Sequence, residues 1–413
     1  MKTEIQTHLH EPAYLERLYR SNRSAFKQAF NELFPYPGGT TAVDYWHARL
    51  NYSSDTIQWG TRKDLVFVVA AAAIAALYAQ LPALFAIDSD FFFPRNIALI
   101  GLVPLAMYFA WKYALPKGKV TMLTGLILVS GVYINLMPDT PQSDTLTLSC
   151  LHLAVVLWAV AGFTFGGGNY RNGAQRVRFL TYNGDLLVMM GLIAISAGIL
   201  SGVTINLFAA IGLQIEDIYG RYVITTCAPA IPLVATYLIQ HNPQLVGKIS
   251  PVIARIFCPL VLIMLVVYLV AMVYGGKDPY TDRNFLLLFN VMLIGVLAII
   301  FFSIAGISST ATSRMSIWTI TLLATVTVIV NSIALSAILF RIAEWGITPN
   351  RAAVLGANVL VLVNLILVSV QLGRVVRQRV PITAVQQTIA RYLPAYVLWA
   401  LVVTFVFPLV FGW

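Results

Sequence analysis

The chain has 413 residues, of which 59% are hydrophobic and 11% are charged, and its formal net charge is +10. Soluble domains carry roughly a quarter charged residues, so this composition excludes an ordinary globular protein. A mean hydropathy of +0.78 over the whole length requires many segments that lie in lipid. The positive charge does not indicate nucleic-acid binding, because it is spread through short loops between apolar runs.

The cysteines and histidines do not form a metal or disulfide pattern. Cys150, Cys227 and Cys258 lie in or beside apolar segments without a C-x-x-C spacing, and no H-E-x-x-H motif occurs. We therefore expect no metal and no other cofactor. Residues 1–63 also lack the apolar core and cleavage site of a signal peptide, so we expect the first internal helix to direct membrane insertion.

Residues 1–63 are predicted to form a small polar helical cap, distinct from a transmembrane region over 64–413. Residues 11–34 carry apolar side chains on one helical face and predict a single amphipathic helix. A second short helix is predicted over 41–50. Three roles remain open for this cap: packing on the cytoplasmic ends of the bundle, lying in the bilayer interface, or binding a partner.

From residue 64 onward, apolar runs alternate with short polar loops, which is typical of an all-α polytopic transmembrane helix bundle. About eleven spans are expected from their lengths. The predicted ranges are 64–87, 96–111, 120–137, 145–165, 186–213, 222–240, 256–274, 285–305, 317–340, 352–372 and 393–411. With the N-terminus cytoplasmic and the C-terminus outside, the cytoplasmic loops are rich in Lys and Arg. The lipid bilayer is thus a partner, whereas nothing in the sequence indicates an oligomeric state.

Polar residues inside the predicted spans are mostly amides rather than charges, so no proton relay or ion path is indicated. These amides are expected to form hydrogen bonds between neighbouring helices. They are Asn206, Asn290, Asn331, Asn358 and Asn364. His152 is likewise expected to have a structural role.

Arginine recurs where helices are predicted to re-enter the membrane from the outer face. The four residues are Arg95, Arg221, Arg283 and Arg351. Arginine at a helix N-terminus opposes the helix dipole and the positive-inside bias. An anion held between several such ends would offset both costs, because guanidinium groups suit phosphate or carboxylate. The alternative is local pairing with outer-face acids such as Asp88 and Glu344.

The densest group of polar residues is the string R-I-A-E-W-G-I-T-P-N-R at 341–351. It predicts a helix stop and restart, in which Gly346 adopts a positive φ, Thr348 caps the next helix and Pro349 begins it. We expect a charged cluster and a candidate ligand-binding site here, at the outer face. Its residues are Asp88, Arg95, Arg341, Glu344, Thr348, Asn350 and Arg351.

The string E-W-G-I-T-P-N-R at 344–351 resembles the E-[YW]-G-[IL]-T-x-x-R signature of an uncharacterised family of bacterial multi-pass inner-membrane proteins. The F-x-x-R-N element at 92–96 is similar to the early spans of that family. The resemblance covers residues 60–411. It implies the bacterial inner membrane as the location and points to no particular reaction.

Three functions fit these features. The favoured one is a permease-like or ligand-binding membrane protein that takes a small anionic or lipid-linked ligand at the outer arginines. The second is a non-transporting scaffold or sensor, which the patterned helix over 11–34 would suit. The third is a membrane-embedded enzyme acting on a lipid-linked anion, with Glu344, Asp88 or Asp90 as general base. No nucleophile or metal motif supports the enzyme further.

Overall fold

The computed structural model describes residues 2–21, 23–34, 40–51, 60–138, 140, 144–169, 171–211, 213–242, 249–274, 283–307 and 314–412. Every regular element in these residues is helical, which confirms the all-α class. The chain divides into two compact units, Met1–Gln58 and Trp59–Trp413.

The first unit contains four short helices with a core of their own. They are α1 (Lys2–Thr7), α2 (Pro12–Ser21), α3 (Arg23–Leu33) and α4 (Thr41–Asn51). The helix predicted over 41–50 is confirmed as α4, but the single helix predicted over 11–34 is wrong. Leu15 of α2, Phe26 of α3 and Trp46 of α4 are buried in one cluster. Two helices replace one because folding back removes this apolar face from water.

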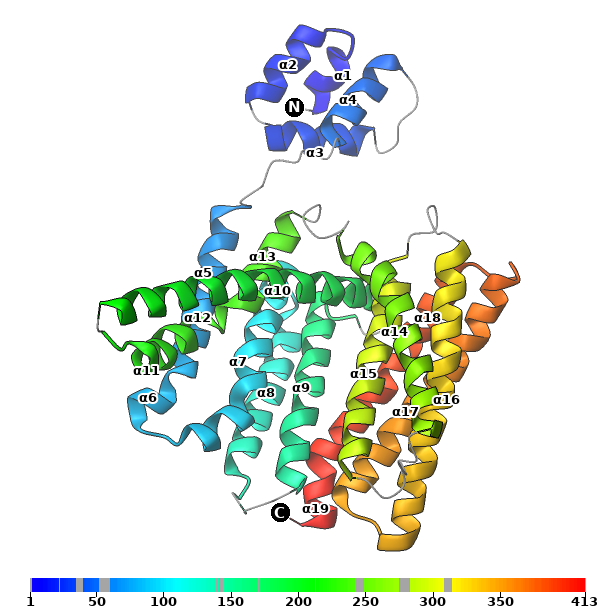
Figure 1. Cartoon of the computed structure of the whole chain (residues 1–413). Helices are drawn as coiled ribbons and strands as arrows, with labels where there is room; N and C mark the ends of the chain where they lie inside the picture. Colours follow the sequence, from blue (N-terminus) through cyan, green and yellow to red (C-terminus); the bar gives the residue numbers. More distant parts are fainter. Residues whose placement is uncertain are drawn as a thin grey trace. The chain divides into compact units, whose positions relative to one another are not determined.

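The second unit is a helical bundle in which most long helices run up and down (Figure 1). Its elements are α5 (Arg62–Ala79), α6 (Leu81–Phe85), α7 (Ser89–Lys112), α8 (Lys117–Leu136), α9 (Asp144–Phe165), α10 (Gly173–Ala210), α11 (Glu216–Ile218), π-helix η1 (Tyr219–Ile224), α12 (Thr225–Cys227), α13 (Ala230–His241), α14 (Ile249–Tyr274), α15 (Arg283–Ala305), α16 (Arg314–Trp345), α17 (Pro349–Val376), α18 (Ile382–Leu401), π-helix η3 (Val402–Val406) and α19 (Phe407–Phe411). We call one end of this bundle the α5 end, where α5, α8 and α18 begin. The other is the α17 end, where α7, α9 and α17 begin (Figure 1).

In the described residues, 8 segments are long and apolar enough to cross a membrane. They are Ser89–Lys112, Lys117–Leu136, Asp144–Phe165, Gly173–Ala209, Glu216–His241, Arg314–Trp345, Pro349–Val376 and Ile382–Phe411. The other predicted spans, 64–87, 256–274 and 285–305, coincide with α5–α6, α14 and α15. The chain is therefore a multi-pass integral membrane protein by the length and composition of its helices. The count of eleven crossings remains a prediction.

Helix α10 differs from the others in length and direction. It has 38 residues, and in Figure 1 it runs across α7, α8 and α9 rather than alongside them. Phe179, Leu180 and Tyr182 in its first part are buried, whereas the apolar side chains after Gly191 are largely exposed. The segment α11–α13 then returns toward α5, and the Gln80 side chain at the end of α5 donates to backbone carbonyls of η1.

A proline near the C-terminus shows how the bundle satisfies its backbone. Pro408 has no N–H, so it cannot bond to the carbonyl four residues earlier, that of Thr404. That oxygen instead accepts hydrogen bonds from Ser149 Oγ at 3.0 Å and Tyr133 Oη at 3.2 Å. An unsatisfied carbonyl in lipid costs several kcal/mol. These bonds therefore fix the last helical segment against α8 and α9.

The amides of the C-terminal half bond between helices as predicted. Asn358 Nδ2 of α17 donates to Asn290 Oδ1 of α15 at 2.9 Å, and Asn331 Nδ2 of α16 donates to Asn358 O at 3.0 Å. Asn364 Nδ2 of α17 donates to Tyr396 Oη of α18 at 3.0 Å. These bonds connect α15, α16, α17 and α18, which confirms the expected role of these amides.

Two other polar residues bond within their own helices. Asn206 is exposed, and its Nδ2 donates to Gly202 O at 2.8 Å, so the interhelical bond predicted for it is wrong. His152 Nδ1 lies 2.8 Å from Leu148 O, one turn earlier in α9, which fits the structural role expected for it.

Candidate functional site

The helix restart predicted between α16 and α17 is present. Gly346 directly follows α16 and has a φ of +75°, a conformation that glycine adopts without the penalty of a Cβ. Thr348 Oγ1 accepts a hydrogen bond from Arg351 N at 3.3 Å and caps α17, whose first residue is Pro349. The local sequence thus specifies this turn through a terminator, a cap and a proline.

Arg351 folds back onto the helix that precedes it. Its Nη1 donates to Trp345 O at 2.8 Å and to Gly346 O at 2.7 Å. Both carbonyls lie at the C-terminal end of α16, where unpaired carbonyls carry partial negative charge. The guanidinium groups of Arg351 and Arg341 lie 5.8 and 5.2 Å from the Trp345 ring centroid. The C-terminus of α16 therefore offsets the cost of an arginine in the first turn of α17.

The acids predicted to pair with these arginines have other surroundings. Glu344 is exposed, and no described residue forms an ion pair with it. Asp88 caps α7, where its Oδ1 accepts a hydrogen bond from Asp90 N at 3.1 Å. Asn350 is the second residue of α17 and is half-buried. The turn thus brings together Arg341, Trp345 and Arg351 without Glu344 as their ionic partner.

Arg95 lies inside a helix rather than at its start. Helix α7 begins at Ser89, so the prediction that Arg95 opens this helix is wrong, because the Asp88 cap starts the helix earlier. The side chain is only 2% exposed. Its guanidinium lies 3.9 Å from the Phe91 ring centroid, Nη1 donates to Phe91 O at 3.0 Å, and Nη2 reaches Met137 O, just after α8, at 3.5 Å.

Arg95 and Arg351 share one structural role. Each reaches a carbonyl at the C-terminal end of a neighbouring helix, α8 for Arg95 and α16 for Arg351. The helices that carry them, α7 and α17, begin at the same end of the bundle (Figure 1). Their contacts nevertheless involve different residues. These contacts explain each arginine locally and do not join the two in one anion site.

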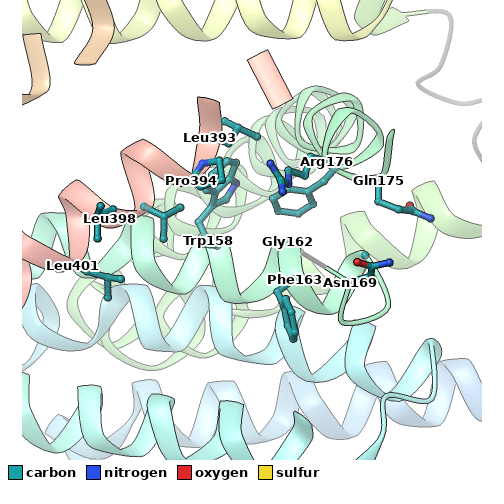
Figure 2. A pocket seen from close by; sticks show the side chains of 14 residues that line it. Trp158, Gly162, Phe163, Asn169, Gln175, Arg176, Leu393, Pro394, Leu398 and Leu401 are labelled. Carbon is teal, nitrogen blue, oxygen red and sulfur yellow. The ribbon is translucent and has the colours of Figure 1, made fainter. Parts of the chain in front are cut away.

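A pocket at the opposite half of the bundle has a more suitable shape for a ligand. It lies between α9, the beginning of α10 and α18, and its volume is about 330 Å³. Its wall is mainly apolar and includes Trp158, Phe163, Phe179, Leu393, Val397, Leu398 and Leu401. Its polar residues are Asn169, Gln175 and Arg176. Figure 2 shows Arg176 and Gln175 at one side of this pocket and Leu398 and Leu401 at the other.

A proline determines the position of Arg176. Pro394 lies inside α18 and has no N–H for the carbonyl of Ala390, one turn earlier. Arg176 Nη1 donates to that oxygen at 2.7 Å. The carbonyl would otherwise be unsatisfied beside an apolar pocket, which is costly. The carbonyl that Pro394 leaves without a helical donor thus holds one guanidinium nitrogen in place, and the Arg176 side chain still lines the pocket.

The pocket is accessible from the side of the bundle. Pro394 is exposed and Leu398 is 64% exposed, so the α18 wall faces the surroundings of the helices. In a membrane protein such an apolar face is in contact with lipid. Trp158 is held by a hydrogen bond from its Nε1 to Asn183 Oδ1 at 3.0 Å. A molecule in the bilayer can therefore enter sideways, between α9 and α18.

Several basic residues lie close in sequence to the polar residues that line the pocket. Arg171 and Arg178 flank Arg176 on the approach to and within α10, and Arg391 follows Ala390; all three are exposed. Lys119 Nζ donates to Gly168 O, in the loop before α10, at 2.9 Å. No acidic residue lines the pocket. This rim consequently favours an anionic or hydrogen-bond-accepting group.

A second cavity, of about 470 Å³, lies between α5, α7 and α8. Its two polar lining residues, Tyr78 and Asn135, bond to the same amide. Tyr78 Oη donates to Asn96 Oδ1 at 2.6 Å, and Asn96 Nδ2 donates to Asn135 Oδ1 at 2.8 Å. Because these groups satisfy one another, the cavity offers a ligand mainly apolar surface.

The sequence does not distinguish Arg176 from the other Lys and Arg residues that make the predicted cytoplasmic loops basic. The informative signal was Pro394, because a proline inside an apolar span leaves a carbonyl that needs another donor. The sequence does not say which donor supplies it. Among the described residues, no group of His, Cys, Asp or Glu could hold a metal ion. No family model, no curated protein and no solved structure matches this chain.

Proposed function

We propose that this multi-pass membrane protein binds an amphipathic ligand that enters its α9–α10–α18 pocket from the bilayer. The main support is that the pocket has two different sides. Arg176 lies at its polar side, and its apolar wall reaches the exposed Leu398. A purely polar solute would leave the apolar wall unused. A purely apolar molecule would place hydrocarbon against the polar side, which Arg176 and Gln175 line. An amphiphile satisfies both sides.

This proposal keeps the ligand-binding, permease-like interpretation and changes the location of its site. The arginines at the α17 end bind helix carbonyls, whereas the pocket has volume, apolar surface and a basic rim. A ligand held between helices is what a permease or a lipid-handling protein requires. The resemblance of 344–351 to bacterial inner-membrane proteins adds a location to the proposal, the bacterial inner membrane.

We infer further that the α5 end faces the cytoplasm and that the C-terminus lies outside. Eleven crossings require α10 and α11–α13 to count as two spans, although α10 runs across its neighbours in this structure (Figure 1). This orientation is supported by the positions of basic residues. The start of α8 and residues 171–172 and 377–381 lie at the α5 end, where basic residues are concentrated (Figure 1). The direction of the other helices is the same whether or not α10–α13 crosses the membrane, because this segment begins and ends at the α5 end (Figure 1). This segment also ends near α5, because His241 Nε2 lies 3.4 Å from Asp64 Oδ2.

Cysteine labelling tests this orientation. Exposed Arg379 and Ile347 are changed to cysteine one at a time, in a background where Cys150, Cys227 and Cys258 are serine. In intact cells, an impermeant maleimide should label the Ile347→Cys variant and should label the Arg379→Cys variant only after permeabilisation. The reverse pattern would contradict the proposed orientation.

Photolabelling tests the ligand pocket. The full chain in phosphatidylcholine nanodiscs is labelled by phosphatidylcholine with a diazirine in one acyl chain, and the modified peptides are mapped. Ala159 lines the pocket, so Ala159→Trp should fill it and reduce labelling of the peptides around Trp158 and Leu398 several-fold. Labelling near Leu77, an exposed residue of α5 that does not line this pocket, is the internal control. Equal labelling at Trp158 in both proteins would refute the pocket as the ligand site.

A further inference from the structure

The pocket that carries the proposed function also has features that select its ligand. Its rim is basic, its wall is apolar, and both occur at one end of the membrane-spanning helices. Arg176 is half-buried, and the Ala390 carbonyl holds its guanidinium in place. A fixed guanidinium loses little side-chain freedom when it binds a further oxygen.

The geometry points to an anionic phospholipid as the ligand, bound from the leaflet at the α5 end, with its phosphate at Arg176 and an acyl chain along Trp158 and Leu398. This inference rests on the proposed function and adds the headgroup charge and the leaflet. Phosphate suits a guanidinium because planar N–H donors match its oxygens. Basic pockets between transmembrane helices are typical sites for anionic lipid headgroups.

The charge of the rim supports a lipid over a neutral amphiphile. Arg171, Arg178 and Arg391 are exposed close in sequence to Arg176 or to its acceptor Ala390, and no acid lines the pocket. The apolar wall supports a lipid over free phosphate, because a small ion would contact only the rim. Trp158, between the two regions, is positioned to report on an acyl chain beside it (Figure 2).

The test uses quenching of Trp158 fluorescence by brominated lipids. The full chain is reconstituted into phosphatidylcholine vesicles that contain either dibrominated phosphatidylglycerol or dibrominated phosphatidylcholine, each at the same mole fraction. The Trp158→Phe variant gives the signal of the other tryptophans, and its subtraction isolates Trp158. We expect brominated phosphatidylglycerol to quench Trp158 at an effective concentration about fivefold lower, the value of one arginine near an anionic lipid.

A substitution of Arg176 alone would also leave the Ala390 carbonyl unsatisfied. The Arg176 charge is therefore removed in a protein whose helix supplies a donor to that carbonyl. Pro394→Ala restores the N–H that bonds to Ala390, and Arg176→Gln is then made in the Pro394→Ala protein. The double variant should show a lower phosphatidylglycerol preference than the Pro394→Ala protein that is its background, while brominated phosphatidylcholine still quenches. Arg377→Gln, an exposed loop arginine at the same end, is the matched control and should retain the preference.

Four results would overturn the inference. The first is an equal preference in Pro394→Ala and in the double variant. The second is an equal loss in Arg377→Gln, which would assign the effect to general surface charge. The third is displacement of brominated phosphatidylglycerol by millimolar inorganic phosphate, which would assign the site to a soluble ion. If both brominated lipids quench Trp158 equally in the wild type, headgroup selection fails while the pocket proposal stands. Failure of the Ala159→Trp photolabelling test removes the pocket itself.

Discussion

Arg351 Nη1 lies 2.8 Å from the carbonyl oxygen of Trp345, so an arginine in the first turn of α17 stabilises the last turn of α16. The same nitrogen bonds to Gly346 O at 2.7 Å, and the Trp345 ring lies beside the guanidinium. One side chain thus connects both helices across the turn. This relationship gives the motif at 344–351 a structural role that requires no ligand.

Arg351→Met should therefore destabilise the protein. It removes two charge-assisted hydrogen bonds from carbonyls at a helix end, and the partial exposure of this turn limits the expected loss to about 1–2 kcal/mol. The free energy of unfolding is measured by SDS titration of the protein in micelles. Arg379→Met, at an exposed arginine of the other end, is the control and should change it little. Stabilisation of the wild type by added phosphate that is lost in Arg351→Met would instead indicate an anion site.

Two glycines should respond to alanine for different reasons. Gly346 has a positive φ, but a Cβ there would meet no atom within 4 Å, so Gly346→Ala should cost only backbone strain of about 1–2 kcal/mol. A Cβ at Gly356 of α17 would overlap the ring of Trp399, so Gly356→Ala should push α17 from α18 and cost about 1–3 kcal/mol.

The loss of stability in Gly356→Ala should be relieved by a smaller side chain at position 399, and the loss in Gly346→Ala should not. In unfolding titrations, Trp399→Leu should recover much of the loss in Gly356→Ala and none of the loss in Gly346→Ala. Additive effects of Gly356→Ala and Trp399→Leu would show that the ring is not the obstacle.

Arg176 and Pro394 should be thermodynamically coupled. In the wild type, Arg176→Met leaves the Ala390 carbonyl without its donor and should cost about 1.5–3 kcal/mol. In the Pro394→Ala background the helix supplies its own N–H, so the same change should cost a few tenths of a kcal/mol. A double-mutant cycle in micelles measures the difference. Equal costs in the two backgrounds would mean that Arg176 does not serve the carbonyl that proline frees.

In the first unit, Glu16 should make the packing of α2 and α4 depend on pH. A hydrogen bond from Arg20 Nε at 2.8 Å, together with Arg49 Nη2 at 3.0 Å, lowers the pKa of this carboxyl. A carboxyl with a lowered pKa contributes stability above its unfolded value and loses that contribution as pH falls through the folded value. Protonation should therefore loosen these helices in acid and leave them unaffected near neutrality.

Hydrogen exchange of the full chain measures this effect. Backbone amides in 12–21 and 41–51, corrected for intrinsic rates, should lose protection as pH falls below the usual titration range of glutamate. Glu16→Gln should have lower protection at neutral pH and less change in acid. A wild-type profile that matches Glu16→Gln at every pH would show that the ion pairs contribute nothing, as is common at exposed sites.

Local chemistry made much of this fold predictable from the sequence. Long apolar runs place helices because lipid leaves the backbone no other partner for its N–H and C=O groups. Gly346, Thr348 and Pro349 specify the turn between α16 and α17 because each acts on its own backbone or on a near neighbour. The roles of Asn331 and Asn358 followed from the same scarcity of hydrogen-bond partners in lipid.

The tertiary structure alone decided which distant groups meet. Arg176 and Ala390 are 214 residues apart, and only packing of α10 against α18 brings the guanidinium to the carbonyl that Pro394 leaves. Arg95 was expected to bind an anion or an acid, because its charge is visible in the sequence while the Met137 carbonyl is not. The course of α10 across its neighbours is equally hidden. The apolar character of a helix determines how much surface it removes from water, but not the direction in which the helix runs. That direction is set by the helices against which it packs.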